Sequence, residues 1–232
     1  MSSTHKTSVR RRCAAMFLAS ALAGGALAAG SLTTASAQPA PPEPSGHLRT
    51  VIVGTAKIEL KESPRNRAIT STSNPNMDCN WYSGYWKTSG DDICSKRSGG
   101  VKYRSNNWCA DFVRYVWSVS GTRTKGFDPF AGSFYRASKT YGTGTYHSKA
   151  SGYTPKPGDA VLYDWDGKPD LGTNGWGVDH VGIVIAYKKG AKYPLTTIEG
   201  NTAPDGKKGP IGTFERHRVT SQVVGYVAPK KK

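Results

Sequence analysis

A cysteine in this sequence has neighbours that suit nucleophilic catalysis. Cys109 follows Asn106 and Asn107, whose side chains are common helix caps, and it precedes an amphipathic run that predicts a helix. The positive end of a helix dipole stabilises a thiolate, and a neighbouring imidazolium stabilises it further. Cys109 is therefore the candidate nucleophile, with a small buried cysteine in a core helix as the alternative interpretation.

His180 is the candidate catalytic base. It opens the β-branched run His180–Tyr187, which predicts a buried strand, whereas the other histidines lie in the N-terminal segment, at a linker or in polar turns. Alternation along the strand puts His180 on one face with small residues such as Gly182, and larger side chains on the other. We expect the helix of Cys109 to pack against the small-residue face.

Glu199 is predicted to orient the imidazole of His180. Residues 188–191 predict a four-residue hairpin turn, and the register of that hairpin sets Glu199 directly opposite His180. Asn201 then becomes the diagonal neighbour. A slip of one residue would turn Glu199 to the other face, and a solvent-exposed acid at a strand end is the alternative interpretation.

The cysteines indicate one disulfide and one free thiol. Cys13 lies in an N-terminal segment that we expect to be removed, which leaves Cys79, Cys94 and Cys109. The two intervals between these three are both 15 residues, so spacing does not choose a pair. Turn residues surround Cys79 and Cys94, and a loop-rich segment at 71–107 needs a covalent link, so we predict that these two are bonded.

The first 37 residues have the pattern of a signal peptide. Lys6 and Arg10–Arg12 precede the uncharged run Ala14–Gly30, and Ala35–Ala37 offers a small-residue cleavage site. This run, rich in Ala and Gly, is a poor transmembrane span. We expect export by the general route or, given the arginine pair, by the twin-arginine route, and no stable membrane anchor.

The chain is strongly basic, with 32 Lys and Arg against 16 Asp and Glu, for a net charge of +16. Loss of four basic residues with the signal segment lowers this charge to +12. Such an excess favours a polyanionic partner, with simple solubility as the alternative. Because the chain has no recognisable nucleic-acid motif, we expect no nucleic-acid partner but a secreted, extracellular monomer associated with an anionic cell wall.

Composition divides the rest of the chain. Residues 38–47 are proline-rich and predict an extended linker, residues 48–229 form the predicted catalytic domain, and residues 230–232 are a basic, solvated tail. Within the domain, residues 49–60 fit either a helix or a strand. Residues 71–107 are rich in Ser, Asn and Gly, which predicts a long ordered loop region.

Four short motifs resemble, in chain order, those of the CHAP family, the cysteine, histidine-dependent amidohydrolases and peptidases. They are Trp108–Val113 (WCADFV), Pro157–Val161 (PGDAV), Asp179–Val184 (DHVGIV) and Ile198–Thr202 (IEGNT). Val224–Tyr226 is similar to the closing strand of the family, so the resemblance spans about residues 106–229. The NlpC-type peptidases, with Asp-Cys-Ser-Gly at the cysteine, match Trp-Cys-Ala-Asp less well.

The resemblance implies a fold and an activity. The fold would be α+β and papain-like, with N-terminal helices on an antiparallel sheet, and the catalytic residues would be Cys109, His180 and Glu199, with Asn201 as a fourth polar group. The activity would be that of a secreted peptidoglycan hydrolase, either an N-acetylmuramoyl-L-alanine amidase or a stem or cross-bridge endopeptidase. A secreted cysteine peptidase or toxin acting on proteins, and a non-catalytic wall-binding protein, are alternatives. No cofactor is expected, and the acidic residues at 164–170 lack the spacing of a calcium loop.

Overall fold

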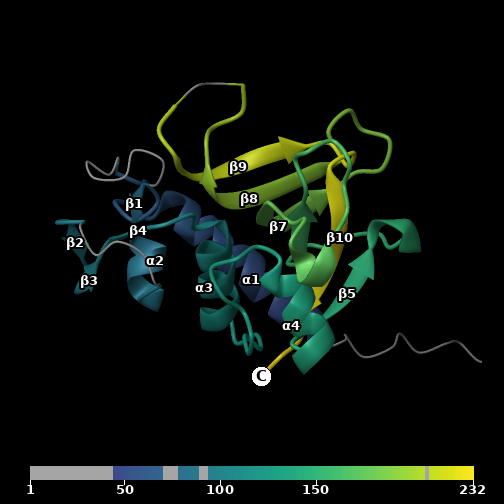
Figure 1. Ribbon diagram of the computed structural model, residues 1–232, viewed down its shortest axis with the longest axis horizontal. Helices are drawn as coiled ribbons and strands as arrows, with labels where there is room; N and C mark the ends of the chain where they lie inside the picture. The colour runs from purple at the N-terminus through teal and green to yellow at the C-terminus, as the bar shows by residue number, and fades with distance from the viewer. Residues whose placement is uncertain (1–43, 70–77, 89–93, 207–208) are drawn as a thin grey trace, which may run out of the picture. The chain divides into compact units, whose positions relative to one another are not determined.

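The computed structural model describes residues 44–69, 78–88, 94–206 and 209–232, so the expected signal peptide lies outside the described residues. The described residues form helices and antiparallel sheets, which confirms the α+β class. None of the described helices is long and apolar enough to cross a membrane. The helices are α1 (Pro44–Lys61), α2 (Trp81–Trp86), α3 (Cys109–Val119) and α4 (Ser133–Tyr141) (Figure 1).

A six-stranded antiparallel sheet is the largest element of the described fold. Its strands, in spatial order, are β5 (Gly144–Ser148), β10 (Val223–Pro229), β6 (Ala160–Tyr163), β7 (His180–Tyr187), β8 (Leu195–Thr202) and β9 (Gly212–Arg218). The last strand of the chain thus lies between β5 and β6. β7 and β8 have partners on both sides, which makes them a rigid support for side chains at their ends.

Helices α1 and α3 pack against β7 and β8 on one face of the sheet (Figure 1). In α1, the buried residues Leu48, Ile52, Ala56 and Glu59 are spaced by four, four and three residues, which fits the period of a helix and not that of a strand. In α3, the apolar side chains of Phe112 and Trp117 are fully buried. Burial of a side chain the size of Phe112 contributes about 1.5–3 kcal/mol to stability.

The face of β7 that α3 covers is opposite to the one we expected. Val181 and Ile183 share the apolar core with α3, whereas Val184 belongs to a separate cluster on the other face. Helix α3 packs on the face with the larger side chains because these supply the apolar area that a packed helix must cover. Close approach of α3 is instead allowed by Gly200 of β8, where an added Cβ would lie 2.6 Å from the Cβ of Phe112.

The segment before α3 is held by a disulfide and short strand pairs. The structure contains the predicted bond between Cys79 and Cys94, with their Cα atoms 5.9 Å apart, and the free thiol of Cys109. The short strands are β1 (Cys79–Asn80) with β4 (Arg104–Ser105), and β2 (Arg97–Ser98) with β3 (Val101–Lys102). The described parts of the predicted loop region, residues 78–88 and 94–107, pack on α3 through α2.

Two predicted boundaries differ from the structure. Helix α1 begins at Pro44, so the end of the expected linker at 38–47 is helical, which is consistent with the tolerance of proline in a first helical turn. At the other end, the backbone of 230–232 is not a free tail. The amide of Arg123 donates to the carbonyl of Lys230 at 2.9 Å, and the amide of Lys232 donates to the carbonyl of Gly121 at 3.0 Å.

Candidate active site

Cys109 is the first residue of α3, and its side chain is buried. Trp108 precedes the helix, and no side chain caps the first turn. The predicted asparagine cap is therefore wrong, because the side-chain oxygen of Asn107 accepts a 3.4 Å hydrogen bond from Asn201 instead. The first amide N–H groups of a helix have no partner within it, so the positive end of the α3 dipole lies at Cys109.

His180 is the first residue of β7 and pairs with Tyr163 of β6. Its side chain is almost completely buried. The centroid of the imidazole lies 6.1 Å from that of the Tyr163 ring and 5.6 Å from that of the Trp165 ring. These rings pack beside the imidazole and limit its rotation, so the strand end presents His180 in a defined orientation.

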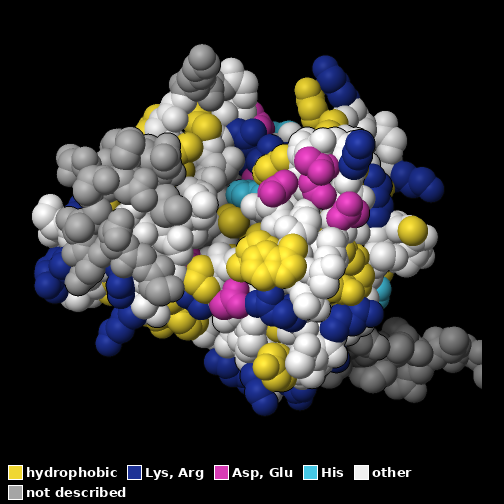
Figure 2. Space-filling model, in the orientation of Figure 1, with side chains coloured by type: hydrophobic (Ala, Val, Ile, Leu, Met, Phe, Trp, Pro, Cys, Tyr) yellow, Lys and Arg dark blue, Asp and Glu magenta, His cyan; other side chains and the backbone are white. Residues whose placement is uncertain are grey.

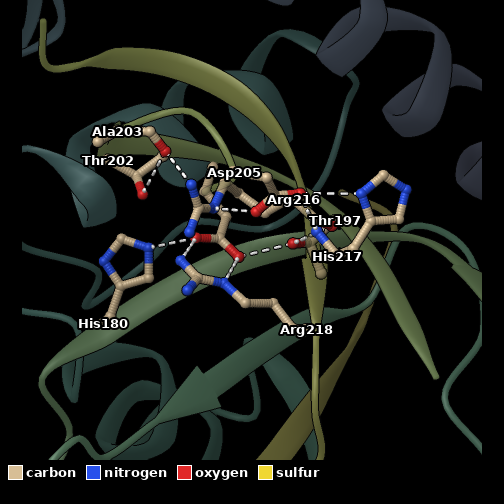
Figure 3. Close-up of polar contacts among 9 residues, drawn as sticks. His180, Thr197, Thr202, Ala203, Asp205, Arg216, His217 and Arg218 are labelled. Atoms are coloured by element: carbon tan, nitrogen blue, oxygen red, sulfur yellow. Dashed lines mark hydrogen bonds and ion pairs between the residues drawn. The ribbon is translucent and has the colours of Figure 1, made fainter. Parts of the chain in front are cut away.

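The carboxylate of Glu199 makes hydrogen bonds with His180, Thr197 and Arg218, and these three partners are labelled in Figure 3. Its Oε2 atom lies 3.0 Å from Nε2 of His180. The hydroxyl of Thr197 donates to Oε1 at 2.6 Å, and Arg218 donates from Nε to Oε1 at 3.0 Å and from Nη2 to Oε2 at 2.5 Å. Glu199 is fully buried, so these donors take the place of water around the charge.

The hairpin that joins β7 and β8 differs from the predicted one. The connection spans residues 188–194 and not 188–191, and the ladder has an irregularity close to the turn. Proline has no N–H for a ladder bond, and Pro194 accordingly ends the loop. Ile183 then pairs with Ile198, so the predicted register is wrong by two residues.

Glu199 consequently lies opposite Gly182 and not opposite His180. A Cβ atom on Gly182 would come within 2.6 Å of Cγ of Glu199, so the absence of a side chain there leaves room for the acid. Because the side-chain period of a strand is two, a shift of two residues keeps Glu199 on the face of His180. Glu199 reaches the imidazole diagonally across the space at Gly182.

The charges of this network shift the pKa values of both partners. Burial alone would lower the pKa of His180, but interactions with Cys109 and Glu199 outweigh it and raise the pKa to about 9. Burial alone would raise the pKa of Glu199, but His180 and Arg218 outweigh it and hold the pKa well below its ordinary value. At neutral pH the site therefore contains an imidazolium and a carboxylate.

Cys109 is also close enough to affect His180. Together with Glu199, it contributes to the raised pKa of His180. Because Nε2 of His180 faces Glu199, Nδ1 is the ring nitrogen that remains for the sulfur. A histidine between a cysteine and a carboxylate is the arrangement that nucleophilic thiol catalysis uses.

The amino-acid sequence matches a known family over more than half of its length. A model of the CHAP domain aligns with residues 70–201. The chain belongs to the CHAP family. CHAP domains are typically amidases or peptidases that act on peptidoglycan, so hydrolysis of amide bonds is the activity that the family supports. No curated protein and no solved structure matches the chain.

The limits of the CHAP match differ from those of the motifs noted in the sequence. The match begins upstream of residue 106, so it includes the disulfide-bonded loop, and it ends at Asn201, before β9 and β10. Cys109, His180 and Glu199 all lie within it. Arg218, which binds Glu199 through two nitrogens, lies outside it.

Asn201 lies beside the CHAP site and not within the hydrogen-bond network of Glu199. Its backbone is left-handed, with φ of 56°, and its amide nitrogen donates to Asn107. This bond links the end of β8 to the segment before α3. Asn201 also lines a pocket next to His180. Its position supports a role in holding the two halves of the site together.

Sequence reasoning did not identify Thr197 and Arg218 as partners of Glu199. Thr197 lies two residues from Glu199 on the same strand face, so alternation alone could have suggested it. Arg218 lies at the end of β9, where Leu195 of β8 is its cross-strand partner. The alternation of Arg216 and Arg218 along β9 was the available signal, but the pairing of β9 with β8 is a long-range contact.

Two other acids of the CHAP motifs have structural partners. Asp111 of WCADFV lies 2.6 Å from Arg114 and accepts a 2.6 Å hydrogen bond from Ser83, which ties α2 to α3. Asp159 of PGDAV lies 2.6 Å from Arg49, which ties α1 to the start of β6. Both acids are fully buried, so removal of either partner would leave a buried charge unpaired.

Within the described ranges, no group of three or more His, Cys, Asp and Glu side chains is arranged to hold a metal ion. In the loop at 164–170, the carboxylate of Asp164 accepts hydrogen bonds from the backbone amides of Asp166 and Asp170. The carboxylate of Asp170 accepts one from the amide of Gly172. These bonds explain the acidic residues as loop-stabilising groups.

Proposed function

We propose that this CHAP-family chain is a secreted peptidoglycan hydrolase that cleaves amide bonds with Cys109 as its nucleophile. The observation that carries the proposal is the buried pair of His180 and Glu199, with Cys109 at the start of α3 as a further group that raises the pKa of His180. The papain-like fold is part of the same proposal. It is supported by the position of the cysteine at a helix start and of the histidine and acid on an antiparallel sheet.

In the proposed mechanism, the thiolate of Cys109 attacks the carbonyl carbon of the amide and forms a tetrahedral intermediate. The backbone N–H of Cys109 at the uncapped start of α3 stabilises the oxyanion. The imidazolium of His180 gives its proton to the leaving amine, and the neutral ring then takes a proton from the water that releases the acyl group. Glu199 keeps the ring oriented through both steps.

The proposed substrate bond is either the one between muramic acid and the first stem alanine or one within the stem or cross-bridge peptide. The family supports peptidoglycan as the polymer. Mass spectrometry of fragments released from purified peptidoglycan distinguishes the two bonds, because only the amidase separates the sugar from the peptide. The N-terminal segment would direct export of the chain. The net charge of +12 on the exported chain would then hold the enzyme on an anionic wall.

The test compares the wild-type chain with Cys109→Ala on purified walls. We expect fragment release by the wild type and a loss of at least about 10³-fold in the variant, since the nucleophile of a catalytic unit is removed. If the wild-type chain leaves the walls intact but cuts a protein substrate, a secreted peptidase or toxin would be favoured. Binding to walls without any release would favour a wall-binding protein, and equal rates for both chains would contradict the mechanism.

A further inference from the structure

A pocket of about 510 Å³ opens beside the proposed catalytic histidine. Its walls come from His180 at the start of β7, from residues 201–204 at the end of β8, from Arg216 and Arg218 of β9, and from Trp165. On the face drawn in Figure 2, Lys or Arg and His side chains meet in a hollow near the centre. Because His180 lines the pocket and is the proposed catalytic partner of Cys109, a substrate at the proposed site lies next to this pocket.

The lining of the pocket is cationic. Arg216, Arg218 and His180 contribute to it, and none of the lining residues carries a carboxylate. Two acids lie nearby: Glu199 is fully buried, and the exposed Asp205 is engaged by His217 at 2.9 Å and by Arg216 at 3.1 Å. A pocket with this lining favours a ligand that brings its own negative charge.

Of the two arginines, Arg216 is the better candidate to donate hydrogen bonds to a ligand in the pocket. Both Nε and Nη2 of Arg218 already bind Glu199. Nη1 of Arg216 donates to the carbonyl of Ala203, and its Nε forms an ion pair with Asp205 at 3.1 Å, although outside hydrogen-bonding geometry. Burial and the like charge of Arg218 lower the pKa of Arg216 although Asp205 and Glu199 act in the opposite direction, so an added anion would be favourable at this position.

We propose that this pocket binds a carboxylate on a residue that adjoins the scissile amide, and that Arg216 is the residue that selects for it. The inference rests on the proposed function, since it names a feature of the peptide that the same site would cleave. A guanidinium with free N–H donors matches the planar geometry of a carboxylate, and the exposed face of Trp165 would cover the apolar part of the same residue.

The test uses two synthetic peptidoglycan fragments that are identical except that one stem residue carries a free carboxylate in the first and a carboxamide in the second. The ratio of kcat/KM for the two fragments is measured for wild type, Arg216→Gln and Arg216→Lys. We expect the wild type to prefer the carboxylate, Arg216→Gln to reduce that preference about tenfold, mainly through KM, and Arg216→Lys to keep part of it. Arg123→Gln, which removes the same charge outside the pocket, should leave the ratio unchanged.

The ratio of kcat/KM for the two fragments tests the carboxylate pocket separately from the proposed hydrolase function. If Arg216→Gln slows both fragments equally, or if the wild type cleaves both equally well at every position where the carboxylate is placed, the carboxylate pocket is wrong while the hydrolase stands. If the wild type cleaves neither fragment and releases nothing from whole walls, the proposed function itself fails. A loss of preference in Arg123→Gln as large as in Arg216→Gln would show a general charge effect and overturn the assignment to the pocket.

Discussion

The carboxylate of Glu199 lies 3.0 Å from Nε2 of His180, although the residue opposite Glu199 in the sheet is Gly182. The contact is diagonal and depends on a missing side chain. It also depends on donors behind the acid, because a fully buried carboxylate needs partners that hold its charge. The following expectations test each part of this arrangement.

The activity should fall as pH rises through about 9. The pKa of His180 in the folded chain is raised from 6.5 to about 9, so the imidazolium and its stabilising interactions are fully present below 6.5 and are lost as pH passes the folded pKa. Glu199→Gln removes a negative charge from the ring, so the alkaline limb of kcat/KM should move to lower pH. An unmoved limb in a folded Glu199→Gln variant would contradict the role of Glu199.

Arg218 should act as a positioning residue through Glu199. Its hydrogen bonds and charge help to hold the pKa of Glu199 low, so Arg218→Gln should raise that pKa and move the acid limb of the kcat profile to higher pH. We expect kcat to fall roughly 10- to 100-fold, in line with the loss of an outer partner of a catalytic group. Arg218→Lys keeps the charge without the two-pronged geometry and should restore only part of kcat. A Gln variant with normal melting and a normal pH profile would refute this role.

Two glycine-to-alanine variants should affect different properties: Gly182→Ala should lower activity, and Gly200→Ala should lower stability. An added Cβ at Gly182 would meet Cγ of Glu199 at 2.6 Å, and displacement of the acid by about 1 Å would cost on the order of 10²-fold in kcat/KM. An added Cβ at Gly200 would meet Phe112 at 2.6 Å, so Gly200→Ala should lower the free energy of unfolding by about 1–3 kcal/mol. Urea unfolding and wall hydrolysis measured on both variants provide the check, and the reverse pattern would contradict the packing described for the two faces.

The disulfide should stabilise the fold without taking part in catalysis. Cys79 and Cys94 close a loop with a sequence separation of 15, and a loop of this size corresponds to about 3 kcal/mol. Replacing both with serine should lower the melting temperature and leave kcat of the remaining folded enzyme close to that of the wild type. In the wild-type chain without residues 1–37, alkylation under denaturing conditions without reduction, followed by peptide mapping, should label Cys109. A label on Cys79 or Cys94 would contradict the bond.

The sequence by itself determined the family and the kind of elements that carry the candidate site residues. Residue types and local periodicity placed Cys109 at a helix start, His180 at the start of a strand and Glu199 on the next strand, and all three placements agree with the structure. These features depend on neighbours within a few residues, which is the range over which pattern and propensity act. The Cys79–Cys94 pair also followed from local context.

Only the tertiary structure decided how these elements meet. The register of β8 against β7, the face on which α3 packs and the supply of donors from Arg218 all differ from or extend the predictions. Each depends on a balance between distant parts of the chain: the loop that Pro194 permits, the apolar area that α3 must cover, and the pairing of β9 with β8. Alternation preserved the correct face for Glu199, because a register error of two residues leaves side-chain direction unchanged.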